Sequence, residues 1–193
     1  MADVWLVVGL GNPGPDYVLT RHNVGVLALD VLGDRAGVQR TRNKKANALV
    51  AEQRVIGGPK VVFAEPLSFM NRSGGPVSAL MDWFNVPLEQ VIVIHDDLDL
   101  EPGAIKLKLG GGHGGHNGLR DIIAARGADF LRVRVGIGRP VGRQDAAQFV
   151  LGRFSATERE ALPESLDRAA DAVELIIRDG LLAAQQVIHA PQS

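Results

Sequence analysis

Short apolar runs alternate along this chain with longer stretches that have helical spacing. Residues 4–8 form an apolar run that is typical of a buried strand. In residues 23–36 the apolar side chains recur on one helical face, and Gly37 suits the position just after a helix. Residues 91–94 are wholly apolar, which favours a strand covered on both faces. This alternation predicts an α/β fold.

The remaining elements follow from the same two patterns. Strands at 48–55 and 60–65, joined by Gly57-Gly58-Pro59, are expected to form a hairpin. Further strands are predicted at 105–109 and 130–137, and further helices from a Ser73 cap to Phe84, from an Asn117 cap over 119–126, and over 163–179. We therefore expect a single domain over residues 1–193, with a twisted mixed β-sheet flanked by α-helices.

Polar side chains follow three of the predicted strands. Asn12 comes after the first strand, Asn71 after the strand at 60–65, and His95 and Asp96 directly after residues 91–94. In an open α/β sheet, functional groups gather beyond the carboxyl ends of the strands. The sequence therefore predicts that these groups meet at one edge of the sheet.

His22, just before the first predicted helix, is the candidate general base. A neutral imidazole accepts a proton near neutral pH, because its ordinary pKa is about 6.5. Asp96 would orient that ring and stabilise its protonated form if the fold brings the two together. Without such a partner, a surface or helix-capping role would be favoured for a lone histidine. Asp97 and Asp99 are expected to be solvated turn residues, and His95 a satisfied side chain at a strand end.

Composition narrows the class of protein. The chain has 193 residues, 46% of them hydrophobic, and no cysteine, which excludes disulfides and a cysteine nucleophile. Without an apolar run of about 18 residues or a secretory start, we expect a cytoplasmic protein that does not enter the membrane. The net charge is −1, yet basic residues concentrate in 35–54 and 106–143, which permits a basic face for phosphates.

Two other types of site need to be weighed. Gly9, Gly11 and Gly14 match the glycine pattern of dinucleotide-binding loops, but Pro13 and Pro15 delay the helix that would face a pyrophosphate. His113 and His116 have no further residues at metal-ligand spacing, so no metal site is expected. A dinucleotide-binding oxidoreductase and a non-catalytic RNA-binding module remain as alternatives.

A series of long motifs runs from about residue 4 to beyond residue 150. They are VGLGNPG at 8–14 with TRHNVG at 20–25, PLSFMN at 66–71 with Ser73 and Gly74, DDLD at 96–99, GGGHGGHNGL at 110–119 and RVGIG at 134–138. In this order they resemble the bacterial-type peptidyl-tRNA hydrolase family. Residues 35–60 are the least motif-like part, and nothing firm carries over there.

The resemblance implies a monomeric, single-domain α/β enzyme without cofactor or metal. It implies hydrolysis of the ester between a peptide and the 3′ end of tRNA, which recycles tRNA from prematurely released peptides. By motif position, His22 is the catalytic base, Asp96 its partner, and Asn12 the group that favours N-blocked substrates. The residues implied in binding are Tyr17, Phe69, Asn71 and Asn117 at the peptidyl-tRNA end, Met70 and His116 in the cleft, and Lys108 and Arg134 at phosphate. Asn71 or loop amides near Gly114 are expected to stabilise the oxyanion.

Overall fold

A seven-stranded mixed sheet forms the centre of the molecule. The computed structural model describes residues 3–191. The strand order is β2-β3-β4-β1-β5-β7-β6, with β4, β1, β5 and β7 parallel and the outer strands antiparallel. The strands are β1 (Val4–Gly9), β2 (Thr41–Asn43), β3 (Ala48–Arg54), β4 (Lys60–Pro66), β5 (Val91–Asp97), β6 (Ile105–Leu109) and β7 (Leu131–Gly136). The predicted α/β class and the mixed sheet are confirmed.

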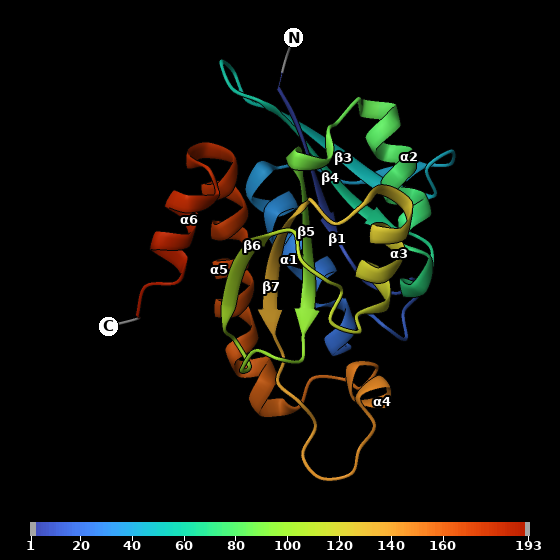
Figure 1. Ribbon diagram of the computed structural model, residues 1–193, viewed down its shortest axis with the longest axis vertical. Helices are drawn as coiled ribbons and strands as arrows, with labels where there is room; N and C mark the ends of the chain where they lie inside the picture. Colours follow the sequence, from blue (N-terminus) through green and yellow to red (C-terminus); the bar gives the residue numbers. More distant parts are fainter. Residues whose placement is uncertain (1–2, 192–193) are drawn as a thin grey trace.

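Helices cover both faces of the sheet (Figure 1). They are α1 (Val24–Ala36), α2 (Gly74–Phe84), α3 (Asn117–Arg126), α4 (Ala146–Val150), α5 (Ala156–Asp179) and α6 (Leu181–Ile188), with 3₁₀ turns η1 (Arg21–Asn23), η2 (Met70–Arg72) and η3 (Leu88–Gln90). One buried apolar cluster joins the sheet to α1, α5 and α6, and the other joins it to α2 and α3. Because helices cover both faces of the sheet, the functional residues that follow its strands lie at an edge of the sheet rather than on a face.

Close packing between α1 and the sheet depends on two glycines. A Cβ built on Gly9 would lie 2.5 Å from the carbonyl oxygen of Gly25, and one on Gly25 would lie 2.2 Å from that of Ile94. Both distances are shorter than any side chain tolerates, so glycine is required for this approach. The contact fixes the first turn of α1, and with it η1, against the carboxyl ends of β1 and β5.

Several element ends differ from the sequence-based prediction. The α5 helix starts at Ala156 rather than 163, because Ser155 and Glu158 form a capping box that extends the helix through polar turns. Ser73 stands before α2 but does not cap it, since its hydroxyl donates to the Met70 carbonyl. Asn117 is the first residue of α3 rather than its cap. The short elements β2, α4 and α6 were not predicted, because each is too short to show a clear period.

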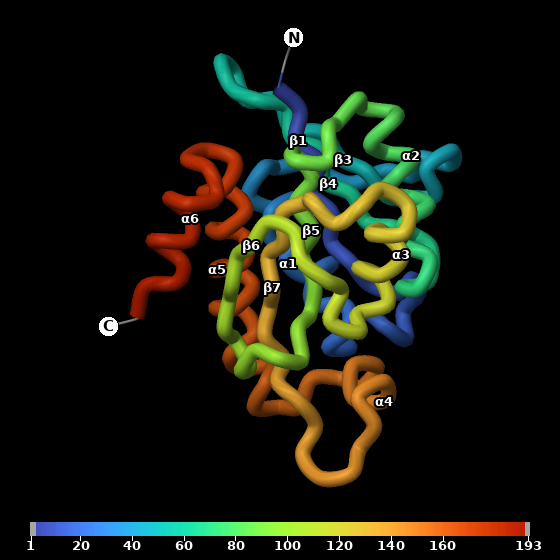
Figure 2. Tube along the Cα trace, in the orientation of Figure 1, coloured from blue at the N-terminus to red at the C-terminus, as the bar shows by residue number. Residues whose placement is uncertain are grey.

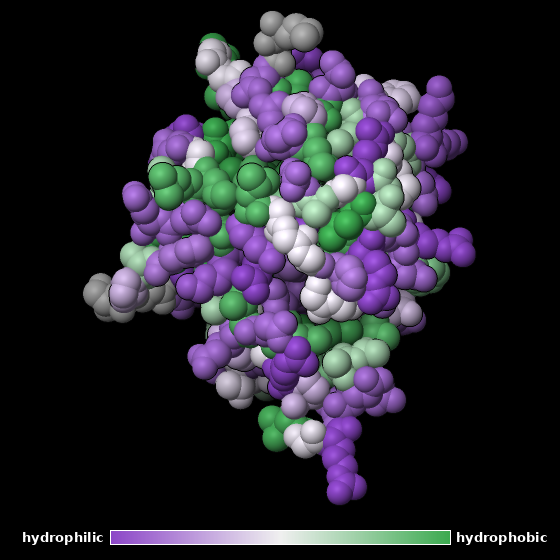
Figure 3. Space-filling model, in the orientation of Figure 1, coloured by the Kyte–Doolittle hydropathy of each residue, from purple (hydrophilic) through white to green (hydrophobic). Residues whose placement is uncertain are grey.

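The carboxyl ends of the parallel strands point toward α4 and the loop before it (Figures 1 and 2). After Gly9, the chain passes through a long loop before it reaches η1 at Arg21. No helix N-terminus therefore follows the glycines directly, which removes the structural basis for the dinucleotide alternative. Among the described residues, no helix has the length and apolar character needed to span a membrane. The face seen in Figure 3 is mostly hydrophilic, with hydrophobic side chains gathered near α6.

Candidate active site

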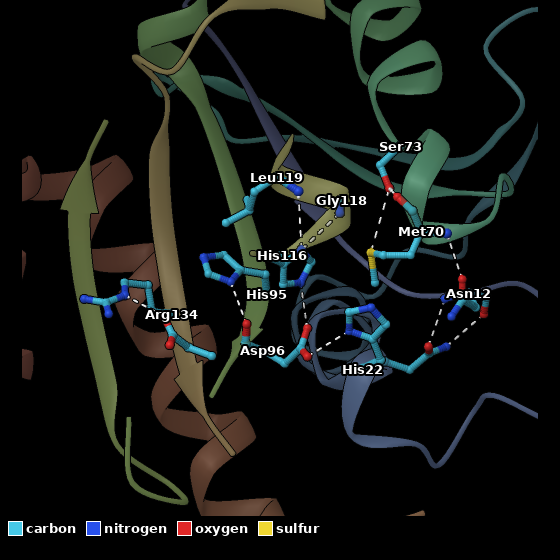
Figure 4. A network of polar contacts seen from close by, with 12 residues as sticks. Asn12, His22, Met70, Ser73, His95, Asp96, His116, Gly118, Leu119 and Arg134 are labelled. Carbon is cyan, nitrogen blue, oxygen red and sulfur yellow. Dashed lines mark hydrogen bonds and ion pairs between the residues drawn. The ribbon is translucent and has the colours of Figure 1, made fainter. Parts of the chain in front are cut away.

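Three side chains from distant parts of the chain meet at the carboxyl end of β5 (Figure 4). The Nδ1 atom of His22, in η1, lies 2.8 Å from Oδ2 of Asp96. The Nε2 atom of His116, just before α3, lies 2.8 Å from Oδ1 of the same carboxylate. His22 and Asp96 are buried, with 7% and 3% of their surface exposed. One carboxylate therefore serves two imidazole rings.

Hydrogen bonds fix which nitrogen of each ring carries the proton. Backbone N–H groups of Gly118 and Leu119 donate to Nδ1 of His116, so this ring caps α3 and must donate to Asp96 through Nε2–H. Because Asp96 is ionised, His22 donates to it through Nδ1–H. The Nε2 atom of neutral His22 then keeps a free lone pair, which is what a general base requires.

The charge of this cluster resides on Asp96. Burial alone would raise the pKa of Asp96, but its electrostatic interactions and hydrogen bonds with His22 and His116 outweigh burial and bring the pKa well below its usual range. For His95, burial and the neighbouring His116 lower the pKa to about 3. His95 donates from Nδ1 to the Asp96 carbonyl, whereas its buried Nε2 has no hydrogen-bond partner within residues 3–191. The prediction of a satisfied side chain is therefore correct for one ring nitrogen and wrong for the other.

A reciprocal pair of amides holds the loop after β1. Asn23 accepts a hydrogen bond from the backbone N–H of Asn12 and donates one to its carbonyl, both at 2.9 Å. The side-chain Oδ1 of Asn12 accepts from the backbone N–H of Met70 at 2.7 Å. Because its oxygen is engaged, Asn12 presents its NH₂ group for any further contact.

A cleft of about 420 Å³ opens beside the His22–Asp96 pair. Its walls come from the end of β5, the glycine-rich loop, and α4 through Ala146, Ala147 and Val150. Three cations also line it: Lys108, Arg132 and Arg134. Burial, then Arg132 and Arg134, lower the pKa of Lys108, so like charges are crowded here. Such crowding favours an anion in the cleft.

Arg132 is fully buried although it lies on β7 next to this cleft. Its guanidinium donates to the carbonyls of Gly111 and Gly112 at 2.7 and 2.6 Å, and to Ala128 at 3.2 Å. These bonds tie the glycine-rich loop to the sheet. They hold in place the segment that carries His116.

His22, Asp96 and His116 are also the one group of residues within 3–191 that is compact enough to hold a metal ion. One ligand atom from each lies within 4.8 Å of the others. In the structure the carboxylate instead accepts a hydrogen bond from each ring. His113, the other candidate from the sequence, also lines the cleft but is not one of these three: its Nδ1 accepts a hydrogen bond from the backbone N–H of Gly115.

Comparison with known proteins identifies this arrangement. Residues 6–193 match the family model described as peptidyl-tRNA hydrolase. The chain belongs to the peptidyl-tRNA hydrolase family. The peptidyl-tRNA hydrolase of Arthrobacter sp. strain FB24 is 56% identical over 191 residues, covering 98% of both chains. That of Streptomyces coelicolor is 52% identical, covering 96% of this chain and 95% of the relative.

A solved structure agrees. The crystal structure of peptidyl-tRNA hydrolase from Acinetobacter baumannii matches with a TM-score of 0.91 and 36% identity, over 100% of this chain and 97% of that one. The predicted family, fold and enzyme class, a carboxylic ester hydrolase acting on peptidyl-tRNA, are thereby confirmed. The roles of individual residues stay predictions in this hydrolase.

Most of the predicted site residues lie around the cleft. Those that line it are His22, Asp96, His116, Asn117, Gly114, Lys108 and Arg134. Asn71 lies in a neighbouring pocket that Asn117 shares, with Arg120. Tyr17 and the exposed Phe69 pack edge to face, with ring centroids 6.4 Å apart. Met70 was expected to line the cleft, but it is buried in the core on the side of α2 and α3.

The structure also corrects the assignment of Asp97 and adds residues that the sequence argument missed. Asp97 is not a solvated turn residue: it ends β5 and accepts a hydrogen bond from Arg134 at 2.8 Å. Asn23 and Arg132 support the site, although neither was singled out. Asn23 follows His22 directly in the motif at 20–25 and was open to inference, whereas nothing local marks Arg132 as buried.

Proposed function

We propose that this chain hydrolyses the ester between a peptide, or an N-blocked amino acid, and the 3′ end of tRNA, with His22 as general base. Water attacks the ester carbonyl and gives a proton to Nε2 of His22. The tetrahedral intermediate then collapses, and that proton passes to the departing ribose oxygen. The observation that carries the proposal is the His22–Asp96 contact at 2.8 Å, which leaves Nε2 unprotonated beside the cleft.

Asp96 is proposed to orient His22 and to stabilise the imidazolium formed during the reaction. Its low pKa supports this, because the carboxylate stays charged throughout the working range. His116 is proposed to hold the carboxylate from the other side, since its own Nδ1 is committed to capping α3. A fixed carboxylate needs little rearrangement when the charge on His22 develops.

The developing oxyanion requires a donor close to the reacting carbon. Gly114 lines the same cleft as His22, whereas Asn71 lies in the neighbouring pocket. We therefore favour loop N–H groups near Gly114 for the oxyanion. Asn71 and Asn117, which share that neighbouring pocket, are proposed to bind the peptidyl-tRNA end, and Asn12 to offer its NH₂ group to the peptide.

Phosphate binding is assigned to Lys108 and Arg134, which line the same cleft as His22. Arg134 is partly compensated by Asp97, so Lys108 carries more of the free positive charge. A monomer that acts as a single domain, as the sequence resemblance implies, is part of the proposal. A tRNA substrate supports action in the cytoplasm. Because His22, oriented by Asp96, can itself activate the water, the proposal includes neither metal nor cofactor.

The test is release of N-acetylated amino acid from tRNA by the purified chain in the presence of a chelator. We expect turnover at a rate that the chelator leaves unchanged. Aminoacyl-tRNA with a free amino group should be hydrolysed less well than the N-acetylated substrate. Binding of tRNA without turnover would instead favour a non-catalytic RNA-binding module. Loss of activity with chelator, restored by added metal, would contradict the metal-free mechanism.

A further inference from the structure

Arg21, the residue before His22, joins the catalytic turn to two other segments. Its Nε and Nη2 donate to the two carboxylate oxygens of Glu158, at 2.9 and 2.7 Å. Its Nη1 donates to the Phe149 carbonyl at 3.0 Å, and the guanidinium lies 4.0 Å from the centre of the Phe149 ring. The side chain of Arg21 thus connects η1, to which it belongs, with α4 and the start of α5.

Backbone contacts continue this junction. The N–H of Arg21 donates to the Gly152 carbonyl and the N–H of Phe154 to the Leu19 carbonyl, both at 3.1 Å. A Cβ on Gly152 would lie 2.8 Å from Nη1 of Arg21, so the chain passes close against the guanidinium. Residues 149–154 are therefore fastened along the loop that leads to His22.

The pair is shielded and charged. The side chains of Arg21 and Glu158 are 12% and 21% exposed. Burial would raise the pKa of Glu158, but its hydrogen bonds with Arg21 and Ser155 outweigh this and lower the pKa. Two parallel N–H···O bonds between a guanidinium and a carboxylate form the strongest and most directional kind of ion pair.

Besides this junction, α4 is held by the packing of Phe149 and Val150 against the edge of the core. None of its five residues is buried. Even so, Ala146, Ala147 and Val150 form one wall of the cleft beside His22. His22 is better secured, because it is buried and bonded to Asp96. If the junction loosened, α4 would move before His22 did.

We propose that Arg21 and Glu158 are positioning residues that hold α4 as a wall of the cleft, so that the acceptor end of the substrate meets a formed site. The inference rests on the hydrolase function proposed above. Loosening the pair leaves α4 in the binding-competent position for only part of the time. The apparent affinity then falls by that fraction, while chemistry in the bound state is preserved.

Glu158→Gln and Arg21→Lys are the variants that test this. The glutamine keeps a side-chain acceptor for the Ser155 N–H, so the capping box survives while the charge is lost. Lysine keeps a positive charge but cannot form the two-pronged contact. With N-acetylated aminoacyl-tRNA, KM should rise about fivefold in Glu158→Gln if α4 is competent about one fifth of the time, with kcat nearly unchanged. Arg21→Lys should also raise KM, because it loses the two-pronged contact with Glu158.

Ser155→Ala is the matched control. It removes the hydroxyl that accepts from the Glu158 N–H at 3.2 Å and leaves the contact with Arg21. It should lower Tm without changing KM. If the role of Glu158 were purely structural, Glu158→Gln and Ser155→Ala should instead behave alike in both Tm and KM.

Hydrogen exchange provides the second readout and does not depend on activity. Amides of 146–150 should exchange faster in Glu158→Gln than in wild type or Ser155→Ala, while those of 21–23 should not. An unchanged KM together with unchanged exchange overturns the inference, as does a fall in kcat alone. If wild type does not turn over, the proposed function fails, and the exchange data still decide whether the pair holds α4. If Arg21→Lys does not fold, Glu158→Gln decides alone.

Discussion

At the scale of single residues, the site depends on which ring nitrogens carry protons. Two backbone donors at the start of α3 bind Nδ1 of His116, so this ring donates a hydrogen bond to Asp96 through Nε2–H. His22 supplies the other hydrogen bond and keeps Nε2 free. The two histidines on one carboxylate are therefore not equivalent: one holds it, and the other can take a proton.

Replacing His22 by asparagine separates these functions. The asparagine NH₂ group occupies about the position of Nδ1–H and can still donate to Asp96, while Nε2 is lost. We expect kcat to fall by about 10²- to 10⁴-fold, the usual contribution of a general base, with KM little changed. Steady-state kinetics with N-acetylated aminoacyl-tRNA measure both constants. Equal loss of binding and rate would argue against the assignment of His22 as base.

The pH dependence of the rate should show a single acid limb. Protonated imidazole cannot accept a proton, so kcat should fall as the pH is lowered from 8 to 5. Asp96 does not contribute to this limb, because its pKa lies well below its usual range and it stays ionised. Initial rates at saturating substrate across this range provide the measurement. A flat profile would remove the histidine from the base role.

His95 should make the stability of the fold depend on pH. In the folded chain its pKa is about 3, whereas an unfolded histidine has a pKa of about 6.5. Between pH 6.5 and 5 the unfolded state binds more protons than the folded state. The free energy of unfolding therefore decreases as the pH is lowered, by up to about 1.4 kcal/mol per pH unit from this group. Asp96 is ionised in both states over this range and adds nothing.

Urea denaturation at pH 6.5 and 5, in wild type and in His95→Asn, measures this term. Asparagine keeps a donor for the Asp96 carbonyl but has no group that titrates here. Its free energy of unfolding should change less between the two pH values. The same change in both proteins would show that other groups cause the acid sensitivity.

At the scale of elements, short connections matter more than the long helices. The Asn12–Asn23 pair closes the loop after β1, and Arg132 fastens the glycine-rich loop to β7. Each brings a loop, which has no regular hydrogen-bond ladder of its own, into a fixed place beside the cleft. These contacts therefore decide the shape of the site, although they bury little apolar surface.

Asn23→Ala tests one of these connections. It removes both 2.9 Å hydrogen bonds to the Asn12 backbone and leaves buried groups without partners, which costs about 1–3 kcal/mol for such a group. We expect a corresponding loss in the free energy of unfolding and a rise in KM, with a smaller effect on kcat than that of His22→Asn. Asn71→Ala, at an exposed position, should leave stability near wild type. Equal stability of the two variants would contradict the structural role of Asn23.

At the scale of the whole molecule, the charge is distributed unevenly although the net charge is only −1. Lys108, Arg132 and Arg134 gather at the cleft, which Asp96, Asp97 and Asp99 also line. Arg134 is paired with Asp97, as Arg35 is with Asp171 elsewhere, so Lys108 is the cleft cation that is most available to a ligand. A binding face can therefore be basic in a nearly neutral protein. This is consistent with a polyanionic substrate that meets only one side of the molecule.

Salt should weaken substrate binding in proportion to the number of phosphates contacted. A plot of log affinity against log salt concentration for tRNA should be linear, and Lys108→Ala should reduce its slope by about 1. Arg178, which pairs with Asp179 at the last turn of α5, provides the control, and its replacement by alanine should leave the slope unchanged. An unchanged slope in Lys108→Ala would place the phosphates elsewhere.

The sequence by itself determined the order and type of the principal elements, the family, and the residues that could carry the chemistry. Local patterns suffice for these, because apolar periodicity, glycine turns and long motifs are properties of neighbouring residues. The strands at 4–8 and 91–94, the helix at 23–36 and its end at Gly37 were all predictable in this way.

Only the tertiary structure decided which of these residues meet. His22 and Asp96 are 74 positions apart, and Arg21 and Glu158 are 137 apart, so no local pattern relates them. The same is true of the His116 cap, the buried Arg132 and the placement of α4. They depend on strand order and on close packing at Gly9 and Gly25, which bring distant segments to one sheet edge. Spatial proximity, which sequence spacing does not encode, turns a set of candidate residues into a site.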